Sequence, residues 1–194
     1  MSKKEFRDDL LTLLIKHAYR KREVVLSSGK KSNFFIDCKQ AVLTAQGHFL
    51  VGHSLLDAID LMDGPRPKAV AGVELGGCSL ASSISLISML KTSDEPNRFP
   101  LDAIYVRKEI KCHGSKRSIE GNDHMSSGTR VVVVEDVVTT GASTLRTVNV
   151  LRDSGFIVSG VVALVDRLEG GREAIESSGL SFVSLFTRKD FPED

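Results

Sequence analysis

The sequence predicts an α/β protein with an open, mostly parallel sheet flanked by helices and a small N-terminal cap. Short apolar runs alternate with segments of helical periodicity from residue 69 onward, which is typical of a parallel sheet with crossover helices. One run has four valines in succession, at 131–134, as expected for a strand buried on both faces. The length of 194 residues suits one domain. We therefore expect a single domain over residues 1–194, with about 1–65 as the cap and about 66–187 as the α/β core.

The cap is expected to begin with a helix. Ser2 and Glu5 have the spacing of a capping box, in which each side chain accepts a hydrogen bond from the other residue's backbone N–H. Apolar residues then recur at helical spacing from Phe6 to Ala18, so the helix should extend to about Tyr19. The other elements expected in the cap are short strands at 24–26 and 34–36 and a helix at 45–62, which Pro65 and Pro67 follow.

The core is expected to alternate strands and helices. The strands are predicted at 69–73, 103–107, 131–134, 157–165 and 180–185. The helices are predicted at 79–91, from the 139–143 loop to about 153, and at 171–178. The stretch 109–128 is polar and has no periodicity, so it is predicted to be a loop.

Composition and charge exclude several classes of protein. Hydrophobic residues make up 41% and charged residues 26%, which excludes general disorder. The net charge of +1 lacks the basic excess of a protein that coats nucleic acid. The three cysteines, Cys38, Cys78 and Cys112, are too few and too scattered for a disulfide framework or a zinc site. No apolar run approaches the ~18 residues of a membrane helix. We therefore expect a cytoplasmic protein without membrane or nucleic-acid partners.

The strongest functional signal is the segment 131–144. Its four valines are followed by Glu135 and Asp136, and then by a Thr/Gly/Ser loop, 139–143, that enters a helix. Ligands of open α/β sheets bind beyond the carboxyl ends of the strands, which is where this loop should lie. Its hydroxyls, the close backbone approach at Gly141 and the helix N-terminus together suit a phosphate group.

The two carboxylates would repel a phosphate but suit the hydroxyls of a sugar, for which they are acceptors. The segment therefore predicts a ribose 5-phosphate site, against the simpler alternative of a strand, an exposed acidic turn and an ordinary helix. Other nucleotide motifs are missing. There is no GxGxxG, and Gly72 and Gly77 have the P-loop spacing but lack the Lys-Ser/Thr that must follow. HExxH and GxSxG are also absent from the sequence.

The second signal is the basic stretch 98–117, which has a net charge of +4 with His113 in addition. Such a cluster suits several phosphates, or pyrophosphate as a leaving group. Gly114 and Gly121 would allow the stretch to act as a lid. The alternative is a solvated basic loop. The basic residues are Arg98, Arg107, Lys108, Lys111, Lys116 and Arg117.

Together these motifs resemble the type I phosphoribosyltransferases, whose signature is a run of β-branched residues, an acid pair and a Thr/Gly/Ser loop. Within that family the sequence is similar to the orotate phosphoribosyltransferases. The segment 28–35, SGKKSNFF, resembles their N-terminal loop, and 107–114, RKEIKCHG, matches their RKxxKxHG lid motif. Asp166 and Arg167 match their base-site Asp-Arg pair. These segments and the acid-pair loop extend over most of the chain.

The resemblance implies transfer of ribose 5-phosphate from phosphoribosyl pyrophosphate (PRPP) to orotate in pyrimidine synthesis, with Mg²⁺ carried by the pyrophosphate rather than held in a protein site. It implies catalytic roles for Lys111 and Asp136, and contacts from Thr139 and Arg167 to orotate. It also implies a homodimer in which the lid of one subunit reaches its neighbour's site. The residues implied to bind PRPP are Arg107, Lys108, Lys111, His113, Glu135, Asp136, Val137, Val138, Thr139, Thr140, Gly141, Ala142 and Ser143.

Two alternatives stay open. A phosphoribosyltransferase for another base would keep the acid-pair loop but would not need Lys111 or Arg167. A non-enzymatic regulator that senses PRPP and binds nucleic acid would need a basic face outside the site, and the basic cluster within 16–31 is a candidate for one. Many members of the family also have a lysine before the Ser-Gly pair, where this chain has Ser27, so Lys30 and Lys31 are candidates for that role.

Overall fold

The computed structural model describes residues 1–25, 31–92, 98–108 and 118–192. The helices are α1 Lys3–His17, α2 Lys39–Val42, α3 Ala45–Asp60, α4 Gly76–Thr92, α5 Ala142–Asp153, α6 Gly171–Ser177 and the 3₁₀ helix η1 Arg188–Asp190. The strands are β1 Tyr19–Val25, β2 Lys31–Ile36, β3 Ala69–Val73, β4 Asp102–Val106, β5 Ile119–Glu120, β6 Arg130–Val138, β7 Ile157–Asp166 and β8 Ser181–Thr187.

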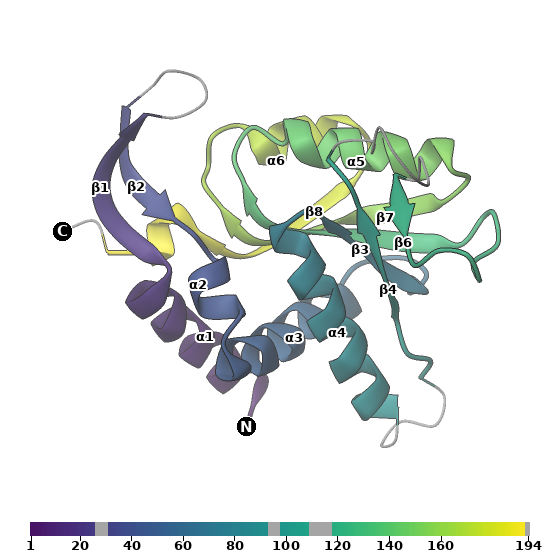
Figure 1. Cartoon of the computed structure of the whole chain (residues 1–194), viewed down its shortest axis with the longest axis horizontal. Coiled ribbons are helices and arrows are strands. Elements are labelled where there is room, and N and C mark those ends of the chain that lie inside the picture. The colour runs from purple at the N-terminus through teal and green to yellow at the C-terminus, as the bar shows by residue number, and fades with distance from the viewer. Residues whose placement is uncertain (26–30, 93–97, 109–117, 193–194) are drawn as a thin grey trace.

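A six-stranded sheet forms the centre of the molecule, with strand order β5-β4-β3-β6-β7-β8 (Figure 1). Every neighbouring pair is parallel except β4 and β5. Strands β1 and β2 form a separate antiparallel hairpin that extends from the N-terminal helices. The predicted fold class, a mostly parallel α/β sheet flanked by helices with a small N-terminal cap, is confirmed.

Helices cover both faces of the sheet, and β6 contributes to both cores. Val132 and Val134 pack in the core that contains α1, α3 and α4, whereas Val131 and Val133 pack in the core beneath α5 and α6. Successive side chains of a strand point to opposite faces, so four buried valines require cover on each side. Figure 1 shows α5 and α6 on one side of the sheet and the N-terminal helices on the other. The prediction of a doubly buried strand is confirmed.

The N-terminal helices belong to the same packing as the sheet. Leu10, Leu14 and Leu55 are fully buried in one cluster with Leu164 of β7 and Phe186 of β8. The cap is therefore joined to the core by a continuous apolar interior. In the part of the chain that the structure describes, no helix combines the length and apolar character needed to cross a membrane.

Helix α1 has the predicted capping box, in which the Ser2 N–H donates to the Glu5 carboxylate at 2.6 Å and the Glu5 N–H donates to the Ser2 hydroxyl at 3.3 Å. It ends at His17 rather than near Tyr19, because Tyr19 already pairs with Ile36 as the first residue of β1. The long-range strand pairing overrides the helical pattern there.

Three further differences lie near the carboxyl edge of the sheet. Strand β6 runs on to Val138, so the acid pair lies within the strand and not after it. Helix α4 begins at Gly76, earlier than the predicted residue 79. The short elements α2 and β5 were not predicted, because four and two residues are too few to show a periodicity.

Candidate functional site

The predicted phosphate loop and the predicted base-site arginine meet at one edge of the sheet. Val138, the last residue of β6, pairs with Asp166, the last residue of β7. The Arg167 N–H extends this ladder by donating to the Val138 carbonyl at 3.0 Å. Thr139 and Arg167 therefore leave neighbouring strands side by side. They share the carboxyl edge of the sheet.

The loop 139–141 connects β6 to α5 and turns at Gly141. This residue is the N-cap of α5 and has a φ of 76°, which side chains rarely adopt. A Cβ there would also lie 3.1 Å from the Gly171 carbonyl oxygen. Because glycine has no side chain to cap the helix, the first N–H groups of α5 are open to an anion. Thr140 and Ala142 are exposed and Ser143 is half-buried, so the loop is accessible from solvent.

Glu135 lies inside the protein. It is 4% exposed, and its carboxylate accepts a hydrogen bond from the Thr144 hydroxyl at 3.2 Å. Burial raises the pKa of Glu135 to about 8, and the negative charge of Asp136 adds to this rise. The positive charge of Lys108 acts in the opposite direction. At neutral pH the Glu135 carboxyl is therefore mostly protonated and can donate a hydrogen bond as well as accept one.

Asp136 lies against the start of α4. A Cβ at Gly76 would be only 2.0 Å from the Asp136 carboxylate, so the close approach of β6 and α4 requires glycine at this position. Gly77 packs equally tightly, with its hypothetical Cβ 2.5 Å from the Val134 carbonyl oxygen. The Gly76-Gly77 pair forms the first turn of α4, beside the acid pair.

Helix α2 brings a lysine toward the acid pair that the sequence analysis did not identify. The Cys38 thiol donates to the Asp136 carbonyl oxygen at 4.0 Å, which places α2 beside β6. Lys39 forms an ion pair with Asp37 at 2.6 Å. This hydrogen bond raises the pKa of Lys39, and the negative charge of Asp136 raises it further. The only sequence feature that pointed to Lys39 was its position shortly after the N-terminal loop motif, 28–35.

The two basic residues at the end of β4 each form a polar contact with a glutamate. The Arg107 guanidinium forms an ion pair with Glu120 of β5, with Nε and Nη2 both 2.8 Å from Oε1. Lys108 is exposed, and its backbone N–H donates to the Glu74 carboxylate at 3.1 Å. Lys111 and His113, the other predicted pyrophosphate ligands, lie outside the described residues.

Arg167 is fixed by the N-terminal hairpin. It is 9% exposed, and its Nη2 donates to the Phe34 carbonyl at 3.3 Å. The same nitrogen lies 2.9 Å from Oε1 of Glu169, and its guanidinium carbon is 5.5 Å from the Phe34 ring centroid. Phe34 itself is 3% exposed, so its ring is part of the core. The predicted base site is thus built from β7 and β2 together.

Within the described residues, no group of three or more His, Cys, Asp or Glu side chains is placed to hold a metal ion. The acid pair itself is a weak cation site, because Glu135 is mostly protonated at neutral pH. The oxygens of the acid pair suit sugar hydroxyls better than a metal ion.

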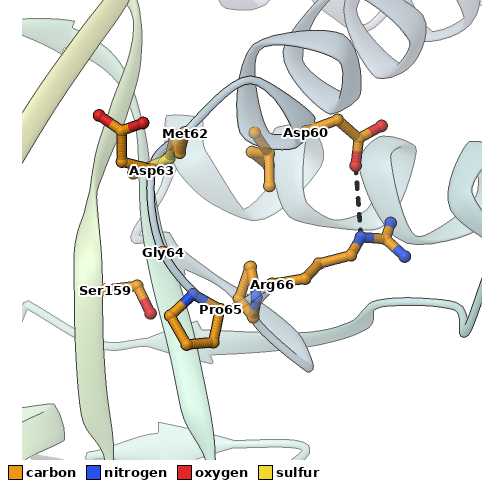
Figure 2. Close-up of a pocket in the computed structure, with 9 residues that line it drawn as sticks. Asp60, Met62, Asp63, Gly64, Pro65, Arg66 and Ser159 are labelled. Atoms are coloured by element: carbon orange, nitrogen blue, oxygen red, sulfur yellow. Dashed lines mark ion pairs between the residues drawn. The ribbon is translucent and has the colours of Figure 1, made fainter.

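A separate cavity of about 80 Å³ lies at the opposite end of the strands. It is lined by the α3–β3 connection and by Ser159, near the start of β7 (Figure 2). An ion pair of 3.3 Å between Asp60 and Arg66 closes one side of it. The cavity contains none of the predicted site residues.

No protein-family model matches the chain. The chain is 53% identical over 188 residues to the orotate phosphoribosyltransferase of Sorangium cellulosum, an alignment that covers 97% of this chain and 94% of the relative. It is 42% identical to the orotate phosphoribosyltransferase of a Synechocystis species, over 97% and 90% of the two chains. The chain belongs to the orotate phosphoribosyltransferase family. It is therefore a transferase.

The fold agrees with that of a solved orotate phosphoribosyltransferase. The Mycobacterium tuberculosis enzyme in complex with PRPP superposes with a TM-score of 0.73 at 31% identity, over 95% of this chain and 98% of that one. The resemblance that the motifs predicted is confirmed.

The buried carboxyl of Glu135 makes a prediction about stability. Because its pKa rises from the usual 4.5 to about 8 on folding, the folded protein holds a proton that the unfolded chain releases between these values. The free energy of unfolding should therefore fall as the pH rises from about 4.5 to about 8. Glu135→Gln should remove this contribution. The difference in the free energy of unfolding between the variant and the wild type, measured by denaturant titration, should therefore change between about pH 4.5 and about pH 8.

Glu173→Gln is the matched control, because Glu173 is an exposed carboxylate on α6. The free energy of unfolding of this variant should depend on pH in the same way as that of the wild type. Parallel stability curves for wild type and Glu135→Gln would show that the burial of Glu135 does not govern its protonation.

Proposed function

We propose that this protein transfers ribose 5-phosphate from PRPP to orotate, giving orotidine 5′-phosphate and pyrophosphate in pyrimidine biosynthesis. The main support is that the acid pair, the Thr/Gly/Ser loop and Arg167 occupy one sheet edge. The names of the close relatives support the same reaction. A cytoplasmic location is part of the proposal, since Cys38 and Cys78 are free thiols, as suits a reducing compartment.

The loop and the acid pair would hold the ribose 5-phosphate. The N–H groups at the start of α5 and the hydroxyls of Thr139, Thr140 and Ser143 suit the 5-phosphate, with Gly141 and Ala142 allowing close approach. Val137 and Val138 support this segment as the last residues of β6. Glu135 and Asp136 would bind the ribose hydroxyls, and the protonated Glu135 could donate to one of them.

Breaking the bond between ribose and pyrophosphate builds positive charge on the sugar carbon and negative charge on the leaving group. Asp136 would stabilise the charge on the sugar. Arg107, Lys108, Lys111 and His113 would stabilise the pyrophosphate, an effect for which one donor is typically worth ~3–4 kcal/mol. Arg107 would then share its guanidinium between Glu120 and the pyrophosphate. Mg²⁺, carried on the pyrophosphate oxygens, would neutralise further charge.

Orotate differs from uracil by a carboxylate, and Arg167 provides a planar guanidinium that matches it. Its placement beside Thr139 lets one residue from each of two neighbouring strands contact the base. A neutral base has no carboxylate for Arg167 to pair with, which favours orotate over uracil and the purines.

A panel of bases tests the proposal. The protein is incubated with PRPP, Mg²⁺ and each of orotate, uracil, adenine, hypoxanthine and nicotinate, and pyrophosphate release is followed. We expect release with orotate alone. Release with another base in preference to orotate would identify a different phosphoribosyltransferase, and no release with any base would favour the non-enzymatic regulator.

Arg167→Leu should weaken orotate binding selectively. Loss of a charge-assisted hydrogen bond, typically ~1.5–3 kcal/mol, corresponds to a roughly tenfold to several-hundredfold loss of orotate affinity when the carboxylate is also left unpaired. The affinity for PRPP should change little, because other residues bind its phosphates. Titration calorimetry with each substrate measures both. Arg152→Leu, an exposed arginine on α5, is the control. Equal losses for both substrates would mean that Arg167 supports the fold rather than the base.

A homodimer is the second part of the proposal. Leu86, Met89 and Leu90 of α4 are 59%, 57% and 59% exposed and form one apolar stripe, since residues three and four apart share a helix face. Contiguous exposed apolar surface of this kind is typical of protein contacts. Helix α4 begins beside the acid pair at Gly76 and carries this stripe in its second half.

Mixed dimers test whether the lid acts on the neighbouring subunit. Lys111→Ala and Asp136→Asn should each abolish most activity alone. If Lys111 acts across the dimer, a heterodimer of the two variants has one site with both lesions and one with neither. A random equal mixture should then recover activity in about a quarter of all sites. A mixture no more active than its parents, with subunit exchange confirmed by mass spectrometry, would show that each site lies within one chain.

A further inference from the structure

A second arginine occupies the position next to Arg167 on the neighbouring strand. Strand β8 pairs with β7 in parallel, and its last residue, Thr187, is aligned with Asp166. The residues that follow, Arg188 and Arg167, therefore leave the same sheet edge side by side. Arg188 is the first residue of η1. The sequence analysis did not identify it.

Both arginines reach the same aromatic ring. The guanidinium carbons of Arg167 and Arg188 lie 5.5 Å and 5.6 Å from the Phe34 ring centroid. Tyr19 and Phe191 pack on Phe34 from other directions, with ring centroids 5.4 Å and 5.5 Å away. The Phe34 ring is thus a common neighbour of the two guanidinium groups.

The backbone of Arg188 is held in place. Asp190 accepts hydrogen bonds from the Thr187 N–H at 2.7 Å and from the Thr187 hydroxyl at 3.0 Å, which closes the 3₁₀ turn. The Phe191 N–H donates to the Arg188 carbonyl at 3.3 Å. Asp190 is also 3.5 Å from the Arg7 guanidinium, so its charge is directed toward α1.

The two arginines differ in their anionic partners. Arg167 has Glu169 at 2.9 Å, which offsets its charge. The half-buried Arg188 guanidinium makes no hydrogen bond or ion pair with any residue that the structure describes. The Arg167–Glu169 pair is neutral as a unit, so the positive charge that can attract an incoming carboxylate comes from Arg188. A partly desolvated cation is most stable when an anion pairs with it.

We propose that Arg188 is a specificity-determining residue that supplies the second cation for the carboxylate of the base substrate, beside Arg167. The inference rests on the proposed function, because it takes orotate as that base. In this arrangement Arg167 orients the carboxylate and Arg188 balances its charge. A neutral base would gain nothing from Arg188.

Three variants test the role of Arg188. Arg188→Met keeps the length of the side chain and removes the charge, whereas Arg188→Lys keeps the charge. Lys189→Met removes the adjacent, exposed positive charge of η1 and is the matched control. For each, KM is measured for orotate and for PRPP, uracil is tested as a neutral competitor, and the melting temperature is recorded.

We expect Arg188→Met to raise KM for orotate by about tenfold, the order expected for a charge-assisted hydrogen bond. KM for PRPP and inhibition by uracil should stay within about twofold of wild type, since neither involves a base carboxylate. Arg188→Lys should recover part of the loss. Lys189→Met should behave as wild type.

Several outcomes would overturn the inference. A lower melting temperature with unchanged KM for orotate would make Arg188 only a support for Phe34. An equal loss of affinity for orotate and for uracil would mean that the substitution distorts the site. An equal rise in KM for orotate with Lys189→Met would mean that any nearby positive charge acts through the overall electrostatic field. The proposed function is checked separately on the wild type. If the wild type uses orotate but Arg188→Met is unaltered, only this inference fails. If the wild type does not use orotate, both fail.

Discussion

The parallel pairing of β6 with β7 fixes the position of the phosphate loop relative to Arg167. Val138 is aligned with Asp166, and the Arg167 N–H donates to the Val138 carbonyl. A slip of one residue along this ladder would exchange the side chains of β6 between the two cores, so each valine would meet the packing of the wrong face. The hydrophobic burial of β6 therefore sets the register, and the register sets where the phosphate loop starts relative to Arg167.

The extension of β6 through the acid pair has an electrostatic consequence. A carboxyl at the end of an exposed turn would be solvated and ionised at neutral pH. In the strand, Glu135 lies under α5 with Thr144 as its partner, and burial raises its pKa to about 8. Asp136, on the other side of the strand, stays half-buried against Gly76. The buried Glu135 carboxyl is therefore available to a sugar diol as a hydrogen-bond donor at neutral pH.

The features predicted from the sequence are those that local patterns determine. Four valines at 131–134 leave no polar face, so a doubly buried strand and its carboxyl edge could be predicted. The continuation of that strand could not, because charged residues end an apolar run locally while pairing with β7 continues the ladder. Lys39 and Arg188 were missed for the same reason. The packing of α2 beside β6 brings Lys39 under the influence of the Asp136 charge, and β8 brings Arg188 against Phe34. Both relationships join residues far apart in sequence.

The order of the strands separates charge along the site. The cations at the end of β4, Arg107 and Lys108, lie on one side of β6, and the arginines that follow β7 and β8 lie on the other. The acid pair of β6 lies between them. A substrate pair with pyrophosphate at one end and a carboxylate at the other would be held by cations at both ends, with its ribose over Glu135 and Asp136. Positive charge that develops on the sugar carbon would then form beside Asp136, which could stabilise it.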